Sequence, residues 1–197
     1  MKRLRILLWA LVAVAAAGAA FLATRPKAPP TTAPPMVTST SFGGPFTLTG
    51  ADGQPFPSSR LNGKPYAIFF GFTHCPDVCP TTLARLTRLR KAIGTGDEPF
   101  RIVFVSVDPE RDTPAEVGRY AGLFGTPVIG LTGTPASVER VKKLFGIYSQ
   151  KVGSGPDYSV DHTATVLLFD RAGGFAGTIS PDEPEASALG KLKRLVA

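Results

Sequence analysis

The chain has 197 residues, and 43% of them are apolar, which is enough to form the core of one globular domain. Its formal net charge of +7 is unevenly distributed, because residues 1–51 contain five basic and no acidic side chains, whereas residues 52–197 carry a net charge of only +2. No stretch of basic residues interleaved with aromatic side chains stands out, so the composition argues against a nucleic-acid-binding protein.

An uncharged apolar segment follows a short basic N-terminus. Residues 6–23 contain no charge and, as a helix, would span about 27 Å, close to the hydrocarbon thickness of a bilayer. The basic residues before this segment predict that the N-terminus stays in the cytoplasm and that the rest lies on the periplasmic side. The segment is either an uncleaved membrane anchor, which its length favours, or a signal peptide cleaved near Ala17–Ala20.

The sequence therefore predicts three regions. Residues 1–24 form the anchor or signal segment, residues 25–41 a linker and residues 42–197 a globular domain. The linker contains five prolines between positions 26 and 40, which favour an extended polyproline II conformation. We expect a single-pass protein of the cytoplasmic membrane, with its domain held away from the membrane surface on the periplasmic side.

Within the domain, predicted strands alternate with predicted helices. Residues 66–72 and 101–107 are near-continuous apolar runs, typical of strands that are covered on both faces. Thr113 to Glu116 is a capping box with proline at the first helical position. The remaining expected elements are a hairpin at 46–57, helices at 81–93, 134–145 and 181–196, a strand at 128–131 and a hairpin at 163–179. This order predicts an α/β domain with a mixed central sheet flanked by helices and an N-terminal hairpin extension.

The only two cysteines, Cys75 and Cys79, lie in the segment GFTHCPDVCP at 71–80, between a predicted strand and a predicted helix. If the first helical turn includes them, they share one face, and the helix N-terminus should lower the pKa of their thiols. A structural disulfide would add little stability over so short a loop. A redox pair is a second use, although its usual spacing has two intervening residues instead of three. A metal site is the third, since two thiolates select Cu(I) or zinc.

Two thiolates leave a metal ion under-coordinated, and the chain contains two histidines. His74 adjoins Cys75, but its neighbouring position directs its side chain elsewhere. His162 lies just before a predicted strand that should neighbour the strand leading to the cysteines. Asp161 beside it is a candidate partner for its ring. Spacing alone leaves the position of His162 relative to the cysteines open.

Three segments together resemble the Sco/SenC family: GFTHCPDVCP at 71–80, SVDPERDTP at 106–114 and VDHTATVLLFD at 160–170. The resemblance covers residues 42–196 and implies a thioredoxin-like fold behind a membrane anchor and a linker. It also implies that Cys75, Cys79 and His162 bind copper, as Cu(I) and/or Cu(II). The recurrent acidic residues of the family correspond to Asp108 and Asp112. We expect the first to organise the loop after a strand and the second to organise the approach to the Thr113 cap.

The function that the resemblance implies is that of a copper metallochaperone. Such a protein delivers copper to, and/or reduces the cysteines of, the CuA site of cytochrome c oxidase subunit II during assembly. Subunit II or another copper acceptor is then the partner, and Cys75 and Cys79 act as the redox pair in the reductase role. Asp77, which matches the family motif, is expected to tune the site or to contribute to partner recognition.

Other classes of function are weighed against this one. An extracytoplasmic thiol-disulfide oxidoreductase without a physiological metal would use the same two cysteines and would not need His162. A thiol peroxidase is disfavoured because the Pro-x-x-x-Thr-x-x-Cys pattern is absent from the cysteine segment. A purely structural exported domain would leave the paired cysteines unexplained.

Overall fold

The computed structural model describes residues 42–94 and 98–197. The predicted anchor or signal segment and the predicted linker lie outside these ranges. Of the helices in the described ranges, none combines the length and the hydropathy that a membrane crossing requires.

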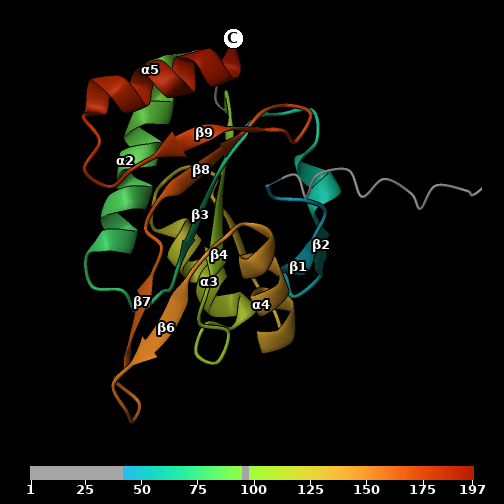
Figure 1. Ribbon diagram of the computed structural model, residues 1–197, viewed down its shortest axis with the longest axis vertical. Helices are drawn as coiled ribbons and strands as arrows, with labels where there is room; N and C mark the ends of the chain where they lie inside the picture. Colours follow the sequence, from blue (N-terminus) through green and yellow to red (C-terminus); the bar gives the residue numbers. More distant parts are fainter. Residues whose placement is uncertain (1–41, 95–97) are drawn as a thin grey trace, which may run out of the picture. The chain divides into compact units, whose positions relative to one another are not determined.

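A seven-stranded mixed sheet forms the centre of the domain (Figure 1). Its strands are β1 (Thr47–Gly50), β2 (Pro55–Pro57), β3 (Tyr66–Gly71), β4 (Arg101–Ser106), β5 (Ile129–Thr132), β8 (Val166–Phe169) and β9 (Phe175–Ile179). They are arranged in the order β2-β1-β5-β4-β3-β8-β9. β4 pairs in parallel with β3 and β5, whereas all other neighbouring strands are antiparallel. The predicted mixed sheet and N-terminal hairpin are therefore confirmed.

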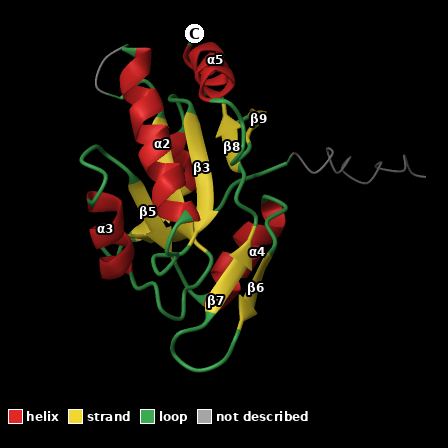
Figure 2. Cartoon of the chain, turned by 90° about the vertical axis from the view of Figure 1, so that its left-hand side faces the viewer, coloured by secondary structure: helices red, strands yellow, loops and turns green. Residues whose placement is uncertain are grey.

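Helices cover both faces of this sheet. They are η1 (Ser58–Leu61), α2 (Val78–Ile93), α3 (Pro114–Gly122), α4 (Pro135–Leu144) and α5 (Glu185–Val196). α2 and α3 connect successive parallel strands and lie on one face, and α5 packs beside α2 (Figures 1 and 2). α4 lies on the other face, where Phe145 at its end packs against Phe70 of β3. Because β3 is covered on both faces, all of its residues are buried, as its apolar sequence predicted.

Local signals set the ends of the helices that frame the site. The capping box of α3 is present, since the Thr113 hydroxyl accepts from the Glu116 N–H and the Glu116 carboxylate accepts from the Thr113 N–H. Gly94, with a φ of 70°, ends α2 in the left-handed conformation that glycine tolerates. α2 starts at Val78, three residues earlier than expected, and this early start brings Cys79 into its first turn.

Strands β6 (Ser149–Val152) and β7 (Ser159–His162) form a separate two-stranded antiparallel sheet that the sequence did not predict. Most of their side chains are exposed, so the segment lacks the apolar alternation that marks a strand in a sequence. His162 is the last residue of β7, and the strand that follows, β8, starts at Val166 and pairs with β3. The expected neighbour of β3 is therefore confirmed, but His162 belongs to the small sheet.

Candidate metal centre

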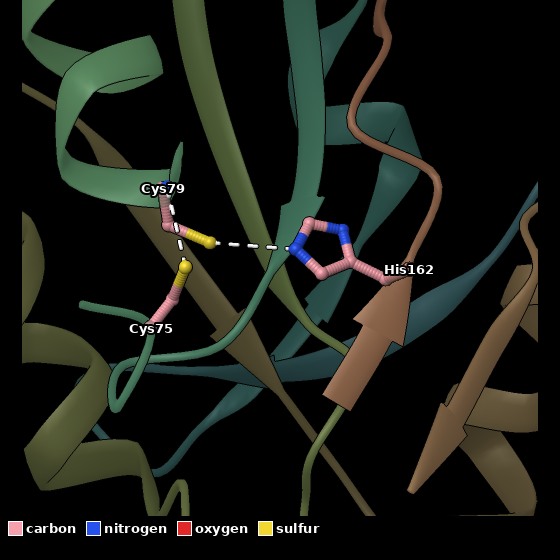
Figure 3. Close-up of side chains that lie close together, drawn as sticks. All are labelled: Cys75, Cys79 and His162. Carbon is pink, nitrogen blue, oxygen red and sulfur yellow. Dashed lines mark hydrogen bonds between the residues drawn. The ribbon is translucent and has the colours of Figure 1, made fainter. Parts of the chain in front are cut away.

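The two cysteines lie at the end of β3 and the start of α2. Cys75 is half-buried in the connecting loop, Cys79 is fully buried in the first helical turn, and both thiols are free. The backbone N–H of Cys79 donates to the sulfur of Cys75 at 3.4 Å. The two sulfurs therefore face the same space (Figure 3), although Cys75 lies in the loop before α2 and not in the helical turn that the spacing argument assumed.

His162 reaches these sulfurs from the end of β7. Its Nε2 lies 3.5 Å from Sγ of Cys79. Each of the three residues offers one ligand atom, and these atoms all lie within 4.8 Å of one another (Figure 3). The imidazole packs edge-on against the rings of Phe69 and Phe72, which restricts its orientation. The structure thus brings together the three residues that the sequence proposed as ligands.

A backbone contact fixes the tautomer of His162. Its Nδ1 lies 3.0 Å from the carbonyl oxygen of Thr163. A carbonyl can only accept, so Nδ1 carries the proton and Nε2 presents its lone pair toward the sulfurs. Metal-binding histidines are commonly held in this way. Burial lowers the pKa of His162, against smaller raising contributions from Thr163 and Asp161, which favours the neutral ring that a metal requires.

The pKa of Cys79 differs from the expectation. A lowered thiol pKa was predicted from the helix N-terminus, but burial raises the pKa of Cys79 well above its ordinary value. A backbone contact with Phe72 offsets part of this effect, whereas Cys75 and Asp112 add to it. The prediction is wrong for Cys79 because the cost of burying a thiolate outweighs the helix terminus. A bound cation would supply the missing positive charge and displace the proton.

Gly71, the last residue of β3, makes room for the buried sulfur. A Cβ atom at this position would lie 2.7 Å from Sγ of Cys79 and 3.0 Å from ring atoms of Phe69 and Phe104. Such distances are well inside van der Waals contact. No local pattern in the sequence marks Gly71 for this role, although it is the first residue of the cysteine segment.

The second histidine has a different environment. Nδ1 of His74 lies 3.1 Å from the hydroxyl of Thr73 and 3.6 Å from a carboxylate oxygen of Asp112. Half of its side chain is exposed, and it does not belong to the cluster of candidate ligands. This arrangement agrees with the expectation that His74 is not a ligand.

Asp112 does more than approach the Thr113 cap. It is fully buried, and its carboxylate accepts from the N–H and the hydroxyl of Thr73 and from the hydroxyl of Ser106. Thr73 lies two residues before Cys75, so Asp112 anchors the cysteine loop. The sequence could not reveal this contact, because the two partners are 39 positions apart.

A groove of about 280 Å³ is lined by two of the three candidate ligands, Cys75 and His162. Phe72, Val78 and Ala164 contribute apolar surface to it, and the exposed side chains of Asp77 and Asp161 also line it. Asp77 additionally accepts a hydrogen bond from the hydroxyl of Thr81. The groove therefore leaves Cys75 and His162 accessible to side chains of another protein, whereas Cys79 lies behind them.

The donor set suits a soft cation held with an open coordination position. Two sulfurs and one imidazole nitrogen favour Cu(I) or zinc over hard cations. A structural zinc site normally closes around four protein ligands, whereas this cluster supplies three in the described part of the chain. The residues thus fit an ion that is bound and then passed on.

Comparison with known proteins agrees with this geometry. The SCO1/SenC family model matches residues 35–197. Protein SCO2 of Saccharomyces cerevisiae mitochondria is 38% identical over 162 residues, which are 80% of this chain and 54% of the yeast protein. The chain spans about half the length of the first curated relatives it matches.

Two solved structures are similar over nearly their whole length. The structure of Bradyrhizobium japonicum ScoI with copper bound is 41% identical and superposes with a TM-score of 0.71, over 78% of this chain and 99% of that one. Arabidopsis thaliana ScoI with copper bound is 34% identical, with a TM-score of 0.74 over 79% and 98% of the two chains. The domain has the mixed α/β, thioredoxin-like fold of these proteins. The chain belongs to the SCO1/SenC family.

Proposed function

We propose that this protein binds one copper ion through Cys75, Cys79 and His162 and delivers it to the CuA site of cytochrome c oxidase subunit II. The observation that carries the proposal is the convergence of two sulfurs and one imidazole nitrogen within 4.8 Å. The copper-bound structures of the ScoI proteins from Bradyrhizobium and Arabidopsis support copper as the metal. The sequence resemblance supports the CuA site as the destination.

The burial of the ligands gives an order to copper release. Cys75 is half-buried and lines the groove, whereas Cys79 is fully enclosed. An incoming thiolate or imidazole of an acceptor therefore reaches the side of the ion held by Cys75 and His162, which also lines the groove, before it reaches Cys79. Cys79 is then the last of the three residues to lose the ion. Cu(II) would be held by the same residues with an additional oxygen ligand.

Thiol-disulfide exchange is the second candidate function, and the unequal exposure of the cysteines favours it as a companion role. The thiolate of Cys75 would attack an acceptor disulfide and form a mixed disulfide, releasing one acceptor thiolate. Cys79 would then attack the sulfur of Cys75, releasing the second acceptor thiolate and leaving a Cys75–Cys79 disulfide. The two cysteines thus supply both electrons, and the acceptor gains the dithiol form that copper requires.

The same proposal includes a location at the cytoplasmic membrane. The apolar segment at 6–23 and the proline-rich linker support a single-pass anchor with the domain in the periplasm. Fractionation of cells followed by alkaline carbonate extraction tests it. A full-length chain that is extracted with the soluble proteins would contradict the anchor.

Transfer to a purified CuA domain tests the function itself. Copper-loaded protein is mixed with the reduced, metal-free acceptor, and the CuA absorption bands report delivery. In a second arm, metal-free reduced protein is mixed with the oxidised acceptor, and new acceptor thiols report reduction. A Cys79→Ser variant is the control in both arms. If neither copper nor electrons reach the acceptor, the proposal is wrong.

A further inference from the structure

The candidate ligands lie on two segments that are only indirectly connected by strand pairing. Among the strands in the described ranges, β7, which ends at His162, pairs with β6 alone, whereas the cysteines follow β3 of the large sheet. The nearest ladder between the two segments is that of β8 with β3, which begins beyond His162, with Leu167 opposite Ile68. Side-chain contacts therefore help to set the distance between the sulfurs and the imidazole. The loop between β4 and α3 contacts both segments.

At one end of this loop, Asp112 holds the cysteine segment. Its buried carboxylate lies 2.9 Å from the backbone nitrogen of Thr73 and 2.6 Å from the Thr73 hydroxyl. The hydroxyl of Thr132 on β5 donates to the backbone carbonyl of Asp112 at 2.8 Å. Asp112 thus connects Thr73, two positions before Cys75, to the last residue of β5, an interior strand of the central sheet.

Four residues earlier, Asp108 holds the histidine segment. Its carboxylate accepts from the hydroxyl of Tyr158 and from Nε of Arg111, both at 2.6 Å. Tyr158 directly precedes β7, four residues before His162. Asp108 is 95% buried, so water competes little for these charge-assisted contacts.

Arg111 contacts the hairpin of β6 and β7 at two backbone carbonyl groups and at the aromatic ring of Tyr158. Its Nη1 donates to the carbonyl oxygens of Tyr158 at 2.9 Å and Pro156 at 3.2 Å. Its guanidinium carbon lies 3.5 Å from the centroid of the Tyr158 ring. Lys151 of β6 also lies over that ring, at 3.8 Å, and pairs with Glu110 of the loop.

The loop itself is a hydrogen-bonded turn. The backbone N–H groups of Arg111 and Asp112 both donate to the carbonyl of Asp108. The hydroxyl of Ser106 donates to Asp112 and accepts from the N–H of Asp108. The two carboxylates are therefore fixed relative to each other.

We propose that residues 106–112 form a clamp that sets the distance between the cysteine pair and His162, with Arg111 and Tyr158 as positioning residues for His162. The clamp rests on the proposed copper function, because the distance matters only if the three residues share an ion. Weakening the clamp on the histidine side lowers the affinity for Cu(II) more than the affinity for Cu(I). Two thiolates satisfy the soft Cu(I) ion, whereas Cu(II) depends more on the imidazole.

The test compares Arg111→Leu and Tyr158→Phe with Arg90→Leu. Arg90 is a matched control, since it is 2% exposed and donates to the carbonyls of Phe100 and Pro127 near the far end of α2. We expect Arg111→Leu to weaken Cu(II) binding about 10- to 100-fold, with a smaller loss for Cu(I). In this variant, the sulfur-to-Cu(II) charge-transfer absorption band and the electron paramagnetic resonance spectrum of bound Cu(II) should shift. Arg90→Leu should lower the melting temperature and leave the spectra unchanged.

Asp112→Asn examines the other end of the clamp. It loosens the cysteine loop, so the affinities for Cu(I) and Cu(II) should fall together. Wild-type Cu(II) affinity and spectra in both Arg111→Leu and Tyr158→Phe would overturn the proposal. If Arg111→Leu fails to fold, Tyr158→Phe decides alone, because it removes only the hydroxyl that contacts Asp108.

Amide hydrogen exchange in the metal-free protein separates the clamp from the copper function. Arg111→Leu should accelerate exchange in β6 and β7 and leave β3 and β4 as in the wild type. If the wild type binds no copper, the proposed function is wrong, and exchange still reports on the clamp. Unchanged exchange in β6 and β7 would overturn the clamp even if the wild type binds copper.

Discussion

Sγ of Cys79 lies 3.5 Å from Nε2 of His162, although 83 positions separate the two residues in the chain. Since the proton of the imidazole is on Nδ1, Nε2 accepts and the Cys79 thiol donates. Loss of the thiol proton would leave a thiolate facing a lone pair in a buried position. A cation shared by both atoms relieves this repulsion, which is why the contact is suited to metal exchange.

Replacing each histidine in turn distinguishes the proposed ligand, His162, from His74, which only adjoins Cys75 in the sequence. We expect His162→Ala to weaken Cu(I) binding by at least about tenfold, because the imidazole nitrogen is lost. His74→Ala should change it little, because His74 lies by Thr73 and Asp112, outside the cluster. Cys75→Ser and Cys79→Ser should each abolish tight binding. Competition with a chelator of known Cu(I) affinity measures all four variants, and equal losses at the two histidines would contradict the assignment.

Copper affinity should increase with pH. The pKa of the Cys79 thiol is raised, so this group is protonated near neutral pH and copper must displace its proton. Each proton released makes the apparent affinity rise about tenfold per pH unit. The pKa of His162 is lowered, so protons compete with copper for its imidazole nitrogen only at more acidic pH. Dissociation constants measured between pH 5 and pH 8 check the slope, and a flat profile would rule out proton displacement.

The two thiols should differ in reactivity. Cys75 is half-buried, whereas Cys79 has no exposed surface and a raised thiol pKa. Iodoacetamide should therefore modify Cys75 at least about tenfold faster, since the thiolate fraction falls tenfold with each unit of pKa. Mass spectrometry of the cysteine peptides gives both rates, and the denatured protein serves as the control in which they converge. Faster labelling of Cys79 would show that it, and not Cys75, is the attacking thiol.

Local signals account for what the sequence predicted correctly. The apolar runs of β3 and β4 and the Thr113 capping box are short-range patterns, and they fixed the strands and a helix start around the site. The three candidate ligands could be named because two are paired cysteines and the third belongs to a family segment. Their approach to within 4.8 Å could not be predicted, since it depends on the separate sheet of β6 and β7.

Long-range packing accounts for what the sequence missed. The raised pKa of Cys79 follows from burial behind Gly71, which no local pattern reveals. The hairpin of β6 and β7 is polar and is held by Arg111 through contacts that span 45 and 47 positions. Such contacts leave no periodicity in the sequence, so the small sheet escaped prediction.

A carboxylate near α5 should make stability depend on acid pH. Glu183 accepts from Lys191, Ser187 and the N–H of Ser180, and these contacts lower its pKa to about 2. Its stabilising effect is thus present above its ordinary pKa of 4.5 and is lost as pH falls toward about 2.

Glu183→Gln should accordingly lower the melting temperature at pH 7 by about 2–4 °C, the equivalent of about 1 kcal/mol. The difference from the wild type should shrink between pH 4.5 and about 2, the interval over which the wild-type carboxylate becomes protonated. Glu185→Gln is the control, because its 3.8 Å pair with Arg88 is largely exposed and contributes little. Thermal melts of the wild type and the variant at pH 7 and at about pH 2 check this prediction. A difference in melting temperature that does not change with pH would mean that the charge of Glu183 is not the cause.

Gly71→Ala should disturb both the fold and the copper site. The added methyl group would lie 2.7 Å from Sγ of Cys79, so either the sulfur or β3 must move. Overpacking of this kind costs about 1–3 kcal/mol, and displacement of the sulfur changes its position relative to His162. Gly122→Ala is the matched control, because its added Cβ meets no atom within 4 Å and its φ is not positive. We expect Gly71→Ala to unfold at lower denaturant concentration and to bind Cu(I) more weakly, whereas Gly122→Ala should keep wild-type copper affinity. Wild-type stability and affinity in Gly71→Ala would show that the space around Cys79 is not as restricted as the geometry indicates.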